Sequence, residues 1–201
     1  GAVFHRKTTT AAAPAWPLER PARPPAALVG HHERELGHGL WVRAFRTHHP
    51  IASLGYLFFR RVQKLAAAYR GLPGDELARL RAENRPGVFE THDRLELAYA
   101  TDTLSDVLDT APEILEARVL VLECTFLDAT RDVARARERS HLHLDELLAR
   151  AERVRCEAVV LMHFSQSYPP AEVHALLAQR LPPSLAGRVQ AFAPASGNWF
   201  G

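Results

Sequence analysis

The sequence predicts an α/β fold, and residues 117–168 carry most of the evidence for it. Residues 117–123 and 157–164 are two apolar runs with the length and composition of buried parallel strands. Between them, residues 140–156 have apolar side chains at helical spacing. Open parallel sheets place their chemistry just beyond the carboxyl ends of the strands. This strand–helix–strand unit therefore predicts both the fold class and the edge of the sheet where a site should lie.

The other elements follow from apolar alternation and from turn residues. Strands are expected at 41–47 and 53–59, with Gly55 allowing a close approach of two backbones. Further along the chain the sequence predicts helices at 60–70 and 75–83, a turn at Pro86-Gly87, a strand at 95–100, a helix from Leu104, a helix at 171–181 and a strand at 188–193. The expected order is therefore antiparallel strands followed by βαβαβ.

The composition fits one domain with a sizeable core, since 47% of the 201 residues are hydrophobic. We expect residues 1–38 to be a linker or remnant, residues 39–196 to form the domain and residues 197–201 to be a tail. Prolines exclude a helix across most of the first 30 residues. A linker suits them better than a transit peptide, because the chain does not open on methionine. We expect the chain to be processed or a piece of a longer one.

Charge and cysteine content indicate the compartment and the kind of surface that the protein has. The formal net charge is +2, so the strong preference for arginine over lysine reflects composition rather than a basic nucleic-acid surface. Cys124 and Cys156 lie in or beside strand-like runs and are expected to be buried thiols in a reducing compartment. We expect a cytoplasmic protein, or a nuclear or organellar one in a eukaryote. No run of eighteen apolar residues predicts a membrane span.

Three residues of types that can bind metals come just after predicted strands. They are His49, Asp102 and His163. If the strands are neighbours, the three side chains meet at one edge, where this ligand set suits Zn²⁺, with Mn²⁺ as a second option. The alternative is that each is a hydrogen-bonded loop residue, and spacing alone leaves both readings open. His141 precedes the predicted central helix on the loop side and is a candidate general acid. Glu123 ends a predicted strand.

Five segments resemble, in order, the later half of ribonuclease Z, the tRNA 3′-processing endonuclease of the metallo-β-lactamase superfamily, in its short form. The segments are residues 49–56, 99–106, 121–128, 140–146 and 160–168. The resemblance implies a metallo-β-lactamase-like αββα sandwich of which this chain holds the later half. It also implies metal ligation by His49, Asp102 and His163, protonation of the leaving 3′ oxygen by His141, and a supporting role for Glu123.

Three departures from the family pattern weigh against full activity. The leading motif, His-x-His-x-Asp-His, which supplies four metal ligands, occurs nowhere in the sequence. Thr101 stands where the family has a glycine before the bridging aspartate, and Ser167 stands where it has an arginine. Arg60, Arg61 and Lys64 lie where short ribonuclease Z proteins insert a tRNA-gripping arm. We expect these three to bind substrate, although the segment could equally be a solvated helical pair.

The resemblance implies a zinc-dependent endoribonuclease that removes 3′ trailers from precursor tRNA. The complete site would hold two Zn²⁺ ions, and the site in this chain would be partial. A homodimer is a further expectation, because half of a two-sheet sandwich leaves an apolar face open. Two alternatives remain: an inactive or truncated domain of the same fold, and a related hydrolase acting on small esters or cyclic nucleotides.

Overall fold

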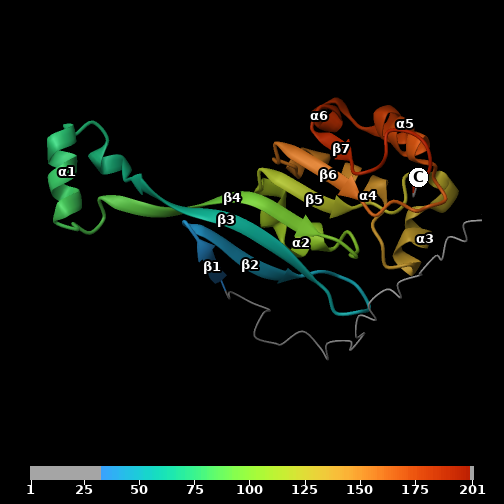
Figure 1. The fold of residues 1–201 in the computed structure, drawn as a ribbon, viewed down its shortest axis with the longest axis horizontal. Helices are drawn as coiled ribbons and strands as arrows, with labels where there is room; N and C mark the ends of the chain where they lie inside the picture. The colour runs from blue at the N-terminus through green and yellow to red at the C-terminus, as the bar shows by residue number, and fades with distance from the viewer. Residues whose placement is uncertain (1–32, 200–201) are drawn as a thin grey trace, which may run out of the picture.

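A computed structural model describes residues 33–199, which form one seven-stranded sheet with helices packed against it (Figure 1). The strands follow one another across the sheet in chain order. They are β1 (Glu33–Gly37), β2 (Leu40–Arg46), β3 (Leu54–Leu65), β4 (Phe89–Ala100), β5 (Val119–Glu123), β6 (Ala158–Met162) and β7 (Val189–Ala191). The helices are η2 (Ala67–Tyr69), α1 (Gly74–Ala82), α2 (Val107–Thr110), η3 (Pro112–Glu116), η4 (Ala129–Arg131), α3 (Val133–Glu138), α4 (Leu144–Leu148), η5 (Ala151–Arg153), α5 (Pro170–Arg180) and α6 (Pro183–Ala186).

The sheet is antiparallel in its first half and parallel in its second, as the sequence predicts. Strands β1 to β4 pair antiparallel, and β4 to β7 pair parallel. Because β2 and β4 both run opposite to β3, the carboxyl ends of β2, β4, β5 and β6 lie at one edge of the sheet. The predicted α/β class is therefore confirmed, with a single sheet in the described residues.

One face of this sheet carries the core. Leu57, Ala98, Leu120 and Val159 stand in register across four strands and are all fully buried. Helical side chains complete the same cluster, among them Val107, Leu108, Ile114, Leu144, Leu147, Val173 and Leu177. Burying this apolar surface is the main driving force for the fold. Cys124 and Cys156 are free and belong to this core, which confirms the prediction of buried thiols; burial raises the pKa of Cys156 to about 11.

The opposite face of the sheet is apolar but open among the described residues. Tyr56 and Tyr99 stand in register on β3 and β4 and are 38% and 37% exposed. Their neighbours on this face are only partly buried: Val42, Ala44, Phe58, Leu97, Val119, Val121, Ala158 and Val160. A contiguous apolar face of this kind usually marks a site of association.

Strands β3 and β4 continue past the sheet as a two-stranded arm that ends in η2 and α1 (Figure 1). Strand β2 accompanies β3 only as far as Arg60, and β5 meets β4 only from Leu97 onward. The helix predicted at 60–70 is therefore wrong in its first half. Cross-strand partners explain the extended backbone, because Arg61 pairs with Asp93 across the hairpin.

The helix predicted at 140–156 is also shorter than expected. Helix α4 ends at Leu148, and η5 follows as a separate turn. The bend lets Arg150 and Arg153 both reach Asp109 at the end of α2, at 2.5 Å each. The apolar stripe still packs inward, since Leu144, Leu147, Ala151 and Val154 are buried. The predicted apolar stripe is therefore present, although the segment is not one continuous helix.

One strand lies outside the expected domain limits. Strand β1 begins at Glu33, inside the segment expected to be a linker, because Glu33 pairs with Arg43 and Arg61 on β2 and β3. Most of the expected linker, residues 1–32, lies outside the described residues, and so does the end of the expected tail. The division into domains stays a prediction. Among residues 33–199, no helix has the length and apolar character that a membrane crossing requires.

Gly55 provides a test of the packing between β2, β3 and β4. A Cβ at this position would collide with the Phe45 ring and come within 2.8 Å of the carbonyl oxygen of Tyr99, which confirms the predicted close approach. We expect Gly55→Ala to lower the free energy of unfolding by about 1–3 kcal/mol, the usual cost of overpacking. Urea denaturation measures it.

Gly74→Ala is the matched control, because open space surrounds Gly74 at the start of α1. It should leave stability unchanged or raise it by up to about 1 kcal/mol. Equal stabilities for the two variants would contradict the close packing at Gly55.

Candidate active site

The site is built around the carboxylate of Glu123, which is fully buried at the end of β5. Four donors converge on it: the amides of Thr103 (2.5 Å) and Leu142 (3.3 Å), the hydroxyl of Thr125 (2.8 Å) and Nδ1 of His141 (3.1 Å). Burying a charge is costly unless several hydrogen bonds compensate it. These four bonds do so, and they tie three separate loops to the end of one strand.

Asp102 and His163 face each other just beyond β4 and β6. His163 Nε2 lies 3.3 Å from Asp102 Oδ1, and that oxygen is buried without a hydrogen-bond partner among the described residues. Both residues have a left-handed backbone, with φ of 50° and 62°. Such φ values are uncommon for side chains other than glycine and gather at functional sites. The backbone is thus bent sharply where each side chain leaves its strand end.

His141 joins them from the loop between α3 and α4. Its ring centroid is 5.0 Å from that of His163, and the hydrogen bond to Glu123 raises the pKa of His141, with the charges of Glu123 and Asp102 acting in the same direction. Because Nδ1 is held by Glu123, Nε2 is the atom free to exchange a proton. Ser140, directly before it, also has a positive φ, 63°.

His49 lies beside this group rather than within it. Its ring centroid is 6.1 Å from that of His141, while its Nδ1 accepts a hydrogen bond from the amide of Ile51. Its loop is fixed to the Asp102 loop, because the His48 amide donates to Thr103 Oγ1 and the Leu104 amide donates to the His48 carbonyl. The predicted ligand His49 therefore shares the edge with the others.

The arrangement fits a divalent cation. Ligand atoms of Asp102, Glu123, His141 and His163 all lie within 4.8 Å of one another. Oxygen and imidazole ligands suit zinc and related metals. Asp102 Oδ1 is the strongest sign, because a buried carboxylate oxygen without a donor is what a cation would satisfy. Glu123 already accepts four hydrogen bonds, so it supports the site rather than offering a free ligand.

Two further residues, Thr125 and His143, support the site. Thr125 contacts both Glu123 and His163; it lies in the segment 121–128 that resembles ribonuclease Z, but nothing in the sequence assigned it a role of its own. His143 is fully buried at the start of α4, where its Nδ1 accepts from the amide of Asp145. Glu146 completes a capping box and accepts from Ser105. Glu146 therefore both stabilises the start of α4 and ties it to Ser105.

The three predicted substrate-binding residues have different surroundings. Arg61 bridges Asp93 and Glu33, and these hydrogen bonds raise the pKa of its guanidinium. Arg60 donates to the His38 carbonyl. Lys64 is exposed, further out along the arm, and makes no ion pair among the described residues. Lys64 is therefore the residue of the three most available to an external anion.

Comparison with known proteins identifies relatives of this chain. It is 39% identical to tRNase Z TRZ1 of Arabidopsis thaliana over 154 residues, which cover 75% of this chain and 54% of that protein. It is 34% identical to chloroplastic tRNase Z TRZ2 of the same plant over 143 residues, 69% of this chain and 40% of that protein.

The chain is homologous to part of the tRNase Z proteins. It spans about half the length of these relatives. No family model matches it. A solved structure similar to this one is the metallo-β-lactamase fold protein YhfI of Bacillus subtilis, with a TM-score of 0.49 and 13% identity, covering 83% of this chain and 51% of that chain.

Glu123→Gln tests how far this tRNase Z homologue depends on its buried carboxylate. An amide keeps the shape of the side chain but turns an NH₂ group toward donors, so at least one of them loses its acceptor. We expect the free energy of unfolding to fall by about 2–3 kcal/mol. Glu138→Gln is the control, because Glu138 is exposed and, within residues 33–199, pairs only with Arg135; it should change stability by less than about 0.5 kcal/mol. An E123Q variant as stable as the wild type would contradict the role given to Glu123.

Proposed function

We propose that this chain is the metal-binding and proton-donating part of a metal-dependent phosphodiesterase that removes 3′ trailers from precursor tRNA. The observation that carries the proposal is the unpartnered Asp102 Oδ1 facing His163 Nε2, with His141 beside them. Homology to tRNase Z proteins supplies the reaction class. The relatives are named as tRNase Z enzymes, and we extend that activity to this chain.

Zinc is the ion that the ligand set favours, with manganese as the alternative. When bound here it would polarise the phosphate ester and activate water. The chain's own residues do the rest. Asp102 and His163 provide ligand atoms, and Glu123 holds His141 so that Nε2 is free to protonate a leaving oxygen. The raised pKa of His141 favours the protonated ring that a general acid needs.

The arm favours a long substrate over a small ester or a cyclic nucleotide. Strands β3 and β4 each have twelve residues, with the site at one end and α1 beyond the other. At about 3.3–3.4 Å per residue, the two ends are roughly 35–40 Å apart. A ligand that touches both the arm and the site must span that distance, which a folded RNA does and a mononucleotide does not.

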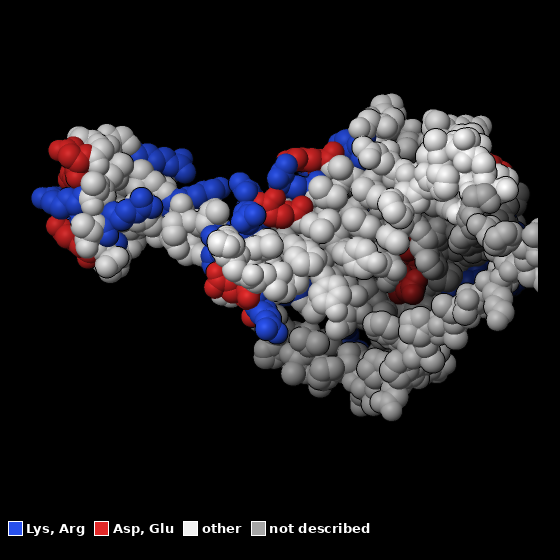
Figure 2. All heavy atoms as spheres, in the orientation of Figure 1, with Lys and Arg blue, Asp and Glu red and all other residues white. Residues whose placement is uncertain are grey.

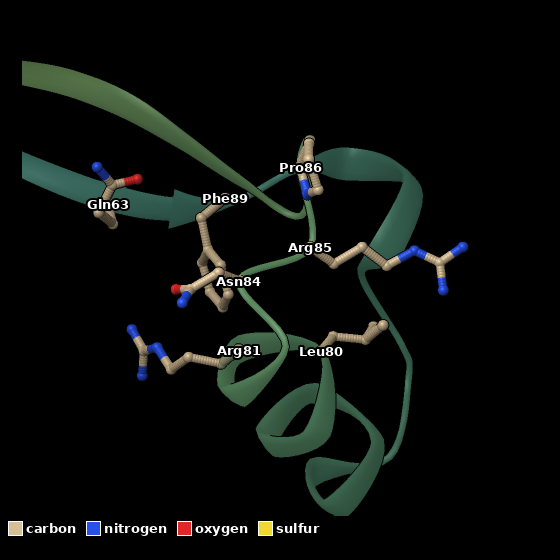
Figure 3. A pocket seen from close by; sticks show the side chains of 8 residues that line it. Gln63, Leu80, Arg81, Asn84, Arg85, Pro86 and Phe89 are labelled. Atoms are coloured by element: carbon tan, nitrogen blue, oxygen red, sulfur yellow. The ribbon is translucent and has the colours of Figure 1, made fainter.

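The arm also has the chemistry for RNA. Residues 60–90 contain seven Lys or Arg and four Asp or Glu, and Figure 2 shows basic side chains interspersed with acidic ones at the tip. A pocket of about 300 Å³ opens there between α1 and the hairpin, and in Figure 3 Arg81 and Arg85 extend to opposite sides of it. The guanidinium carbon of Arg81 lies over the Phe89 ring, 4.7 Å from its centroid. Basic and aromatic side chains together are typical of surfaces that hold nucleic acid.

The test is cleavage of a precursor tRNA carrying a 3′ trailer, in zinc and in excess chelator. We expect zinc-dependent release of the trailer, and loss of cleavage in His141→Ala by a factor of about 10²–10⁴. His174→Ala is the control, because His174 lies on α5, away from the site, and among the described residues its side chain bonds only to the Pro194 carbonyl. Zinc analysis after dialysis should give well under two ions per chain, since few ligands converge here.

A folded, zinc-loaded chain that leaves the precursor intact would overturn the proposal and favour an inactive domain. Hydrolysis of a cyclic nucleotide without any action on RNA would favour the small-substrate alternative. Two tightly held zinc ions per chain would contradict the expected partial site and point to further ligands.

We also propose that the chain associates with itself through the open face of the sheet. Tyr56 and Tyr99 are exposed apolar side chains near the middle of that face. Analytical ultracentrifugation should find a dimer or larger species, and the double substitution Tyr56→Glu and Tyr99→Glu should shift it toward monomer. Ile51→Glu is the control, because Ile51 is 71% exposed but lies in the loop between β2 and β3, off the sheet. A wild-type monomer at all concentrations would sink this proposal.

A further inference from the structure

Thr125 is a buried residue with three hydrogen-bond contacts inside the site. It lies two residues beyond the end of the Glu123 strand and is 6% exposed. Its Oγ1 is 2.8 Å from Glu123 Oε2, 3.0 Å from the His163 carbonyl oxygen and 3.1 Å from His163 Nδ1. The hydroxyl therefore touches the ring and the backbone of one candidate ligand, and the carboxylate that anchors the site.

Counting hydrogens decides which ring nitrogen of His163 carries the proton. A threonine hydroxyl has one hydrogen and accepts through its lone pairs. Two of its neighbours, the Glu123 carboxylate and the His163 carbonyl, can only accept. Whichever of them takes the hydrogen, the bond to Nδ1 is made only if Nδ1 donates. Glu123 Oε2, 4.0 Å from Nδ1, adds a negative charge that favours a proton there.

We propose that Thr125 is a positioning residue that holds His163 in the tautomer with hydrogen on Nδ1, leaving the Nε2 lone pair directed at Asp102 Oδ1 and open to a divalent cation. This inference rests on the metal-binding part of the proposed function. It explains why Nε2 and Oδ1 lie 3.3 Å apart while Oδ1 has no donor among the described residues. Two acceptors that face each other need a cation between them. The other nitrogen of a metal-binding histidine is generally fixed by such a partner.

Thr125 also fixes the backbone of His163. Its hydroxyl lies 3.0 Å from the carbonyl oxygen of that residue, whose φ is 62°, and its own carbonyl accepts from the Ser165 amide at 2.9 Å. These contacts on both sides of His163 hold the left-handed conformation that turns the ring toward Asp102. The same side chain thus sets the direction of the ring and its tautomer.

The first test reads the tautomer in the metal-free chain by long-range ¹H–¹⁵N NMR of the histidine rings, with His163→Gln to assign the signal. At about pH 8, above the ordinary histidine pKa of about 6.5, the wild type should carry its hydrogen on Nδ1. Thr125→Val keeps the shape and removes the hydroxyl, so the hydrogen should move to Nε2, where Asp102 accepts it. Thr125→Ser keeps the hydroxyl and should retain the wild-type tautomer.

The second test measures zinc affinity by titration of the same chains. Thr125→Val should bind zinc about 10–100-fold more weakly, the usual cost of losing the partner of a ligating histidine. Thr125→Ser should stay within about threefold of the wild type. Thr91→Val is the matched control, because Thr91 is exposed on the arm, far along β4 from Asp102, and it should leave both readouts unchanged.

The wild-type tautomer decides the question even if Thr125→Val fails to fold or zinc binds too weakly to titrate. A hydrogen on Nε2 in the wild type would overturn the proposal. So would a folded Thr125→Val chain with an unchanged tautomer. Neither measurement uses RNA, so failure to cleave precursor tRNA leaves this inference standing, whereas failure here leaves the cleavage test unaffected.

Discussion

The buried carboxylate of Glu123 is the interaction on which the site depends. Its four donors belong to three segments: the loop after β4, the segment directly after β5, and the loop that leads into α4. Without that acceptor, two backbone amides would be buried unpaired, at a cost of about 1–3 kcal/mol each. One side chain therefore holds the loops of Asp102 and His141 together, and through Thr125 it reaches His163.

Three residues near the site have a strained, left-handed backbone that neighbouring hydrogen bonds hold in place. Asp102, Ser140 and His163 all have positive φ. Each such residue costs of order 1–3 kcal/mol and persists only where its surroundings over-determine it. The surroundings do so here. Next to Asp102, the Thr103 amide donates to Glu123, and the Ser140 amide donates to the Arg137 carbonyl. The Thr125 hydroxyl lies within hydrogen-bond distance of the His163 carbonyl. The hydrogen bonds that satisfy Glu123 therefore also stabilise the turns that present the ligand atoms.

The sequence was sufficient for the parallel half of the fold, and it placed Asp102 and His163 at the same edge once their strands are neighbours. Parallel strands are continuous apolar runs, and their carboxyl ends share one edge, so the residues that follow them come together. The arm was misread because Arg60 to Lys64 alternates too weakly to separate strand from helix without the partner strand. Thr125 was missed because a lone threonine has no signature until the acceptors around it are known.

Because of where the core lies, the geometry of the candidate metal ligands does not depend on what covers the open face of the sheet. The buried cluster lies between one face of the sheet and the helices, whereas Tyr56 and Tyr99 stand on the opposite face. Glu123 and its donors are held at the strand ends by bonds within the described residues. The geometry of the candidate metal ligands therefore does not require the open face to be covered. Whatever packs there can add ligands to the edge or block access to it, but the pairing of Asp102 with His163 is already set by the strands, by Glu123 and by Thr125.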